Sequence, residues 1–125
     1  MADITPSLPA GRQLIRRYGD GGFEIAGVRH DGSVLVMAGH TLPWPPSRPE
    51  DIDFDSLGPC VSPQVDVTVL LIGTGARLVP VPAELRARLR AHGIGVEAMD
   101  TGAACRTFNV LLTEERAVAA ALIAV

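Results

Sequence analysis

The sequence predicts an α/β fold in which a parallel βαβ unit follows an N-terminal antiparallel β meander. Val65 to Ile72 is an almost continuous run of β-branched and aliphatic residues, which is typical of a strand buried on both faces. Helix-forming residues follow from Glu84 to His92, Gly93 is placed to end that helix in a Schellman motif, and Ile94 to Met99 predicts a second strand. A crossover of this length makes the two strands parallel and the connection right-handed.

Two turn signals divide the first part of the chain into short antiparallel strands. Gly19-Asp20-Gly21-Gly22 predicts a turn after a strand over residues 13–18. Asp31-Gly32 is a dipeptide that two-residue hairpins favour, because both central positions need a positive φ. It separates strands predicted over residues 23–27 and 33–38, so these segments together form the meander.

The segment from His40 to Pro49 holds the only tryptophan among four prolines. One interpretation is a polyproline ligand, since Pro46 to Pro49 matches PxxP. The interpretation that we favour is a rigid connection whose Trp44 covers the edge of the core. The pattern S-x-x-E that begins at Ser47 matches a capping box and predicts a short helix over residues 49–57.

A helix and a strand complete the chain after the βαβ unit. Asp100 or Thr101 is expected to cap a helix over residues 103–112, whose apolar face includes Phe108. The apolar run from Ala117 to Val125 is too short to span a membrane and predicts a buried final strand.

Length and composition indicate a single globular domain over residues 1–125, in which residues 1–11 form a loose arm. A net charge of −3 without a basic stripe excludes the electrostatic footprint of a nucleic-acid-binding protein. No apolar run approaches the ~20 residues that a membrane helix needs, and the N-terminus lacks the pattern of a signal or transit peptide. We therefore expect a cytoplasmic protein that does not insert directly into a membrane.

Residue types and spacings exclude several classes of active site. All 11 basic residues are arginines, so the chain cannot form a lysine Schiff base or a Walker-type phosphate loop. The histidines His30, His40 and His92 lack the spacing of metal ligands, and we expect neither a metal nor an organic cofactor. Cys60 and Cys105 are expected to be free thiols, because they should lie toward opposite ends of the sheet.

The carboxyl ends of the parallel strands are the place where several polar groups should converge into a pocket. One loop follows the first strand of the βαβ unit, and the start of the last helix follows the second strand. The predicted pocket comprises Gly73, Thr74, Gly75, Asp100, Thr101, Cys105, Arg106 and Asn109.

Each motif in this pocket also has a structural interpretation. Gly73-Thr74-Gly75 is not a dinucleotide fingerprint, because Leu78 takes the third glycine position and two prolines delay the helix. Two glycines that turn the backbone off a buried strand are the better interpretation. Cys105 lies in the first turn of a helix, where a thiolate is favoured, but no base is linked to it. A small, half-buried packing cysteine is therefore expected.

Several segments together resemble a family of uncharacterised proteins. These are LLIGTG at residues 70–75 and GIGVEAMDTGAACRTFNVLLTEERAVAAALI at 93–123; GGFEIAGVRHDGSVLVMAG at 21–39 and Trp44 fit the same pattern. The family includes bacterial hypothetical proteins, an archaeal prototype, the mitochondrial assembly factor for respiratory complex I and an animal adipogenesis-associated protein. The resemblance implies the three-layer Mth938-like fold, with a mixed central sheet and an added β layer.

Two functions are compatible with these observations. The resemblance implies a non-catalytic module that binds other proteins, with an assembly role for a membrane-associated respiratory complex as in the mitochondrial relative. The alternative is a small-molecule-binding protein or a thiol-dependent enzyme, with its site between the Gly73–Gly75 loop and the Asp100–Arg106 segment. We favour the first, because the sequence contains no assembled catalytic set.

Overall fold

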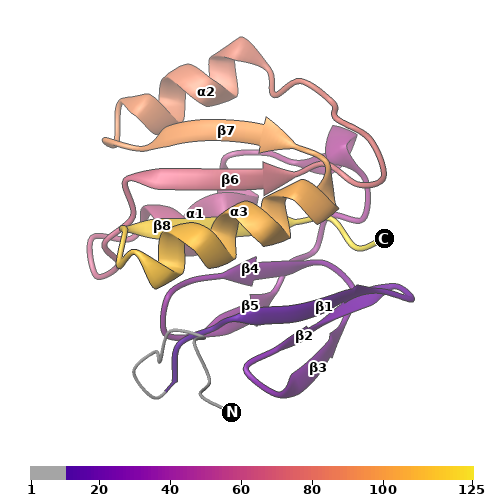
Figure 1. Cartoon of the computed structure of the whole chain (residues 1–125). Coiled ribbons are helices and arrows are strands. Elements are labelled where there is room, and N and C mark those ends of the chain that lie inside the picture. Colours follow the sequence, from indigo (N-terminus) through magenta and orange to yellow (C-terminus); the bar gives the residue numbers. More distant parts are fainter. Residues whose placement is uncertain (1–10) are drawn as a thin grey trace.

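The computed structural model describes residues 11–125, which begin with a three-stranded antiparallel sheet (Figure 1). Its strands are β1 (Ile15–Gly19), β2 (Gly22–Ile25) and β3 (Val28–Asp31). The first predicted turn is present: Gly19 pairs with Gly22, and Asp20 and Gly21 between them have φ values of 53° and 77°. Apart from Gly11, the loose arm expected over residues 1–11 lies outside the described residues.

The second hairpin turn is not at Asp31-Gly32, where it was predicted. It lies at Ala26-Gly27, whose φ values of 50° and 81° join Ile25 to its partner Val28. The prediction was wrong because alanine rarely adopts a positive φ, so this turn carries a weak sequence signal. The strong signal at Asp31-Gly32 marks the place where the chain leaves one sheet for the other.

The second sheet has five strands in the order β5-β4-β8-β6-β7 and is mixed, as expected. The central strand β8 pairs antiparallel with β4 and parallel with β6, and β6 pairs parallel with β7. The strand β5 lies in the proline-rich connection and was not predicted. The strands are β4 (Val34–Val36), β5 (Thr41–Pro43), β6 (Val69–Gly73), β7 (Gly95–Met99) and β8 (Val118–Leu122).

The α-helices are α1 (Gly58–Val61), α2 (Ala83–Arg90) and α3 (Thr101–Thr113). The end of α2 has the predicted Schellman hydrogen bonds: the amide of Gly93 donates to the carbonyl of Arg90 (2.9 Å), and that of Ile94 to the carbonyl of Leu89 (3.1 Å). Gly93 has a φ of 79°. The predicted cap of α3 is also present, because the carboxylate of Asp100 accepts a hydrogen bond from the amide of Ala103 (2.9 Å).

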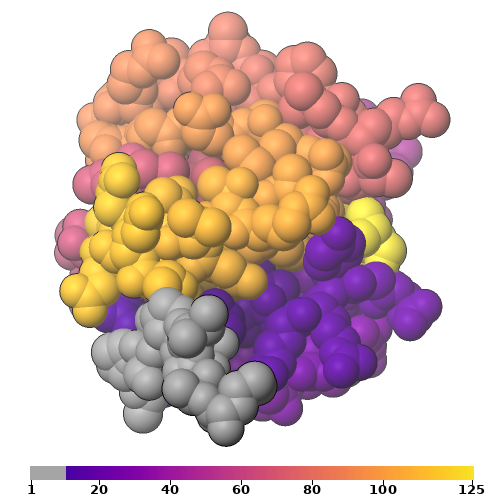
Figure 2. Space-filling model, viewed as in Figure 1, coloured from indigo at the N-terminus to yellow at the C-terminus, as the bar shows by residue number. Residues whose placement is uncertain are grey.

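The five-stranded sheet separates two apolar clusters, since alternate residues of its strands face opposite sides. On one face, α1, α2 and the connection that holds Trp44 cover the sheet. On the other face lie α3 and the three-stranded sheet. Figures 1 and 2 show α3 running across this second face, with the N-terminal strands beside it. The arrangement is the expected three-layer α/β fold with an added β layer.

The proline-rich connection covers the core, as expected from the interpretation that Trp44 packs over its edge. Trp44 is 3% exposed and its Nε1 donates a hydrogen bond to the carbonyl of Ser56 (3.0 Å). The prediction of a single helix over residues 49–57 is wrong. The structure has two 3₁₀ turns instead, η1 (Pro49–Asp51) and η2 (Asp55–Leu57). Between them the carboxylate of Asp53 accepts a hydrogen bond from the amide of Ser56 (2.8 Å), which interrupts the helix with a local turn.

Candidate functional site

The structure brings the two loops of the predicted pocket into direct contact. The amide of Thr101 donates a hydrogen bond to the carbonyl of Gly75 (2.8 Å). In return, the amide of Gly75 donates to Oγ1 of Thr101 (2.9 Å). The amide of Thr74 also reaches the carbonyl of Met99, at the end of β7 (2.9 Å). The parallel strands β6 and β7 therefore present both loops at one rim of the sheet, next to the end of β8.

The polar groups at this rim bind to the chain itself. Oγ1 of Thr74 donates to the carbonyl of Arg77 (2.7 Å) and accepts from the amide of Val79 (2.9 Å). Oγ1 of Thr101 donates to the carbonyl of Ile123 (2.7 Å). Both threonines are buried, and their hydroxyl groups hold loops together through these hydrogen bonds.

The glycines at this rim allow a close approach of backbones. A Cβ atom at Gly73 would lie 3.0 Å from both the Cα of Thr101 and the Cδ2 of Leu122. Glycine at this position therefore lets α3 begin directly against β6 and β8. Gly75 has a φ of +106°, which an L side chain rarely adopts. Both observations agree with the structural interpretation of the glycine loop.

Cys105 is fully buried and was predicted to be half-buried. It is 2% exposed and packs in the apolar cluster beneath α3. Burial raises the pKa of this thiol to about 12, although the charge of Arg106 acts in the opposite direction. Cys60 is also a free thiol, and burial raises its pKa to about 12. The two cysteines lie in different clusters, so the sheet itself stands between them.

Asn109 and Arg106 face the N-terminal sheet. The side chain of Asn109 pairs with the backbone of Ile15, accepting from its amide (2.9 Å) and donating to its carbonyl (2.7 Å). Nη1 of Arg106 donates to the hydroxyl of Tyr18 (3.0 Å). A Cβ atom at Gly102 would lie 2.6 Å from that hydroxyl, so Tyr18 lies directly on the first turn of α3. These side chains join α3 to β1.

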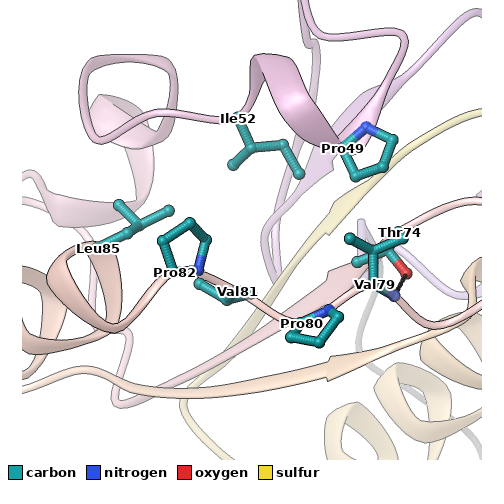
Figure 3. Close-up of a pocket in the computed structure, with 8 residues that line it drawn as sticks. All are labelled: Pro49, Ile52, Thr74, Val79, Pro80, Val81, Pro82 and Leu85. Atoms are coloured by element: carbon teal, nitrogen blue, oxygen red, sulfur yellow. Dashed lines mark hydrogen bonds between the residues drawn. The ribbon is translucent and has the colours of Figure 1, made fainter.

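A groove that the sequence did not predict lies between the η1–η2 segment and the start of α2; we call it the α2 groove. Figure 3 shows its narrow end, where Pro49 and Ile52 face the segment of residues 79–82 that leads into α2. This end has a volume of about 10 Å³, room for about one water molecule. Of the predicted residues, Thr74 reaches it. The narrow end is lined by Pro49, Ile52, Thr74, Val81, Pro82 and Leu85, among others.

The wide end of the α2 groove has a volume of about 270 Å³. It shares Ile52, Pro82 and Leu85 with the narrow end and adds Asp53, Phe54, Glu84 and Arg88. The Cζ atom of Arg88 lies 4.0 Å from the centre of the Phe54 ring, which is a cation–π contact. An apolar floor with charged groups at its margin can accept an apolar side chain from a partner.

The described residues were also compared with the requirements of a metal site and of a membrane-spanning helix. No group of three or more histidine, cysteine, aspartate or glutamate side chains in residues 11–125 is arranged to hold a metal ion. Within the same range, no helix is both long enough and apolar enough to cross a bilayer.

Comparisons with known proteins give consistent matches. The sequence model of a family described as "Protein of unknown function (DUF498/DUF598)" matches residues 15–123. An uncharacterized protein of Rhodobacter capsulatus is 40% identical over 123 residues, which cover 98% of this chain and 93% of the relative. NADH dehydrogenase (ubiquinone) 1 alpha subcomplex assembly factor 3 is 39% identical over 110 residues in Danio rerio. The human protein of that name is 33% identical over 109 residues.

The matched regions cover 88% and 87% of this chain, but only 63% of the Danio rerio assembly factor and 59% of the human one. The fold is shared by solved structures, of which two are examples. A structure described as an outer membrane protein from Bartonella henselae has a TM-score of 0.84 at 41% identity, and the match covers 91% of this chain and 96% of that one. A Bordetella pertussis protein described as an Mth938-like domain has a TM-score of 0.80 at 31% identity, with coverages of 97% and 91%.

Proposed function

This chain belongs to the DUF498/DUF598 family, and we propose that it is a non-catalytic protein-binding module that assists the assembly of a membrane-associated respiratory complex. The observation that carries the proposal is the similarity to the assembly factors, at 39% identity over 88% of this chain for the Danio rerio protein. The name of these relatives describes factors that assemble a subcomplex of NADH dehydrogenase. The region that this chain matches makes up more than half of the length of the Danio rerio and human proteins.

The chemistry of the rim supports a binding role over a catalytic one. The hydroxyl groups of Thr74 and Thr101 have hydrogen-bond partners within the chain. A thiol enzyme needs an accessible thiolate, whereas Cys105 is buried and its pKa is raised to about 12. A small-molecule or thiol-dependent site at this rim is therefore disfavoured, and the exposed surface is where the module would act.

The proposal is tested by comparing respiratory complexes from cells with and without the gene on native gels. We expect the deletion to lower the amount of assembled complex and to leave partly assembled intermediates. Reintroducing the chain should restore the assembled form, and tagged chain should co-purify with those intermediates. Unchanged assembly in the deletion strain would contradict the proposed role.

A further inference from the structure

The α2 groove has the features of a binding site for a particular kind of peptide segment. We propose that it binds a segment of a partner protein that carries an apolar anchor side chain beside arginine or lysine. This inference rests on the proposed protein-binding function and names the surface and the partner chemistry that would serve it.

The apolar part of the groove fits the anchor. Ile52, Phe54 and Leu85 line the wide end. Ile52 and Phe54 are partly buried against the cluster on this face of the sheet, and Leu85 is 8% exposed within it. A volume of about 270 Å³ leaves room for one large apolar side chain. The groove is therefore suited to an anchor residue.

The charges at the margin favour a basic partner. Asp53 and Glu84 line the wide end and are exposed, and none of the ion pairs among residues 11–125 includes either of them. The one lining cation, Arg88, already lies over the Phe54 ring. The same η1–η2 segment carries Glu50, Asp51 and Asp55, of which the first two share one cation, Arg48. Among the residues that line the wide end, two carboxylates therefore face one cation.

The walls of the groove are already fixed before a partner arrives. Pro49, Pro80 and Pro82 restrict the backbone on both sides. The hydroxyl of Thr74 forms hydrogen bonds with the backbone of Arg77 and Val79, which hold the start of the segment that leads into α2. Since little ordering is needed on binding, more of the contact energy is retained as affinity.

The first test uses a fluorescein-labelled amphipathic peptide of leucine and lysine, titrated with the full chain and followed by fluorescence anisotropy. We expect Glu84→Arg to weaken binding about tenfold through like-charge repulsion, and Ile52→Ser to weaken it about fivefold through loss of the apolar contact. Glu114→Arg is the matched control. It changes the net charge equally, but Glu114 follows α3 on the other face of the sheet, so binding should be unchanged.

Peptides in which glutamate replaces lysine, or serine replaces leucine, should bind at least about tenfold more weakly to the unmodified chain. Glu84 is exposed, so its variant should fold, which thermal unfolding verifies. Equal binding by the unmodified chain, Glu84→Arg and Glu114→Arg would overturn the inference. So would equal binding of the lysine and glutamate peptides.

A complementation experiment separates this inference from the proposed function. If the gene deletion impairs assembly and Glu84→Arg fails to restore it while Glu114→Arg succeeds, both stand. If the deletion leaves assembly unchanged but Glu84→Arg still loses the peptide, the assembly role fails and the groove assignment stands. If Glu84→Arg restores assembly and binds the peptide like the unmodified chain, the groove assignment fails and the assembly role stands.

Discussion

Thr101 illustrates how a residue predicted to lie in a ligand pocket can instead be required for the fold. Its hydroxyl accepts from the amide of Gly75 and donates to the carbonyl of Ile123, and it has no exposed surface. One side chain therefore joins the loop after β6, the first turn of α3 and the segment after β8. Because its proton is already donated and the residue is fully buried, this hydroxyl is not accessible to a ligand.

We expect Thr101→Val to destabilise the protein by about 2–4 kcal/mol, because it removes the partner of two buried backbone groups without changing the volume much. Thr101→Ser keeps the hydroxyl and should cost only about 1 kcal/mol for the lost methyl group. Urea unfolding of the two variants measures the difference. Equal stability of the valine and serine variants would show that these hydrogen bonds contribute little.

The buried thiols predict how stability depends on pH. Burial raises the pKa of Cys60 and Cys105 to about 12 in the folded state, whereas an unfolded thiol titrates near about 8.5. Below the pKa of the unfolded thiol, both thiols are protonated in the folded and the unfolded state. Their contribution to the free energy of unfolding is therefore fully present in that pH range. Above the pKa of the unfolded thiol, only the unfolded state loses protons. The free energy of unfolding should then fall by up to about 1.4 kcal/mol per pH unit for each thiol, until the pH reaches the pKa of the folded thiol.

The measurement is the free energy of unfolding at a series of pH values from neutral upward, with Cys105→Ala as the control that removes one titrating group. Native protein should also react with iodoacetamide far more slowly than protein in denaturant. Rapid alkylation of Cys105 in native protein near neutral pH would contradict the buried, protonated state.

At the scale of the elements, the hairpin between β2 and β3 carries local strain. Ala26 has a φ of 50°, in the left-handed region that costs a residue with a Cβ about 1–2 kcal/mol. Ala26→Asn should therefore stabilise the protein by about 1 kcal/mol, because Asn-Gly is the favoured pair for this turn. Gly27→Ala, at a φ of 81°, should destabilise it by about 1 kcal/mol. Thermal unfolding of both variants tests the signs, and a loss of stability in Ala26→Asn would be inconsistent with strain.

The contact between α3 and β1 is one of the links that hold the N-terminal sheet to the rest of the molecule. Asn109 forms both of its hydrogen bonds with the backbone of Ile15, and its removal leaves two backbone groups without this partner. We expect Asn109→Ala to destabilise the protein by about 1–3 kcal/mol. Amide hydrogen exchange should accelerate more in β1–β3 than in β6. Arg106→Ala removes an exposed contact with Tyr18 and should change stability by less than about 0.5 kcal/mol.

In the molecule as a whole, the two faces of the central sheet have different surroundings. One face, under α3, is tied to the N-terminal sheet and buries Cys105. The other, under α2, ends at a groove with an apolar floor and acidic margin.

If the function is binding, the thiol of Cys105 is dispensable. We expect Cys105→Ala to restore assembly of the respiratory complex in a deletion strain as well as the unmodified chain does, with protein levels compared by immunoblot. A variant that accumulates normally but fails to restore assembly would favour the thiol-dependent alternative.

Local residue patterns were enough to predict the features that depend on neighbouring residues. The strand–helix–strand unit of β6, α2 and β7, the Gly93 motif that ends α2 and the Asp100 cap of α3 follow from local apolar patterns and cap residues. The buried strand β8 followed from its unbroken apolar run. Each signal lies within a few residues of the structure it predicts.

Long-range packing sets which sheet each N-terminal strand joins, where the second hairpin turns and what the polar side chains bind. Thr101 and Asn109 were correctly placed on or beside one helix, yet their hydrogen-bond partners lie far away in the sequence. Thr101 binds Gly75 and Ile123, and Asn109 binds Ile15. The α2 groove likewise forms between segments that meet only in the folded chain. Burial and hydrogen-bond partnership are properties of the packed chain, so a local pattern can identify a reactive group but not whether the fold leaves it free.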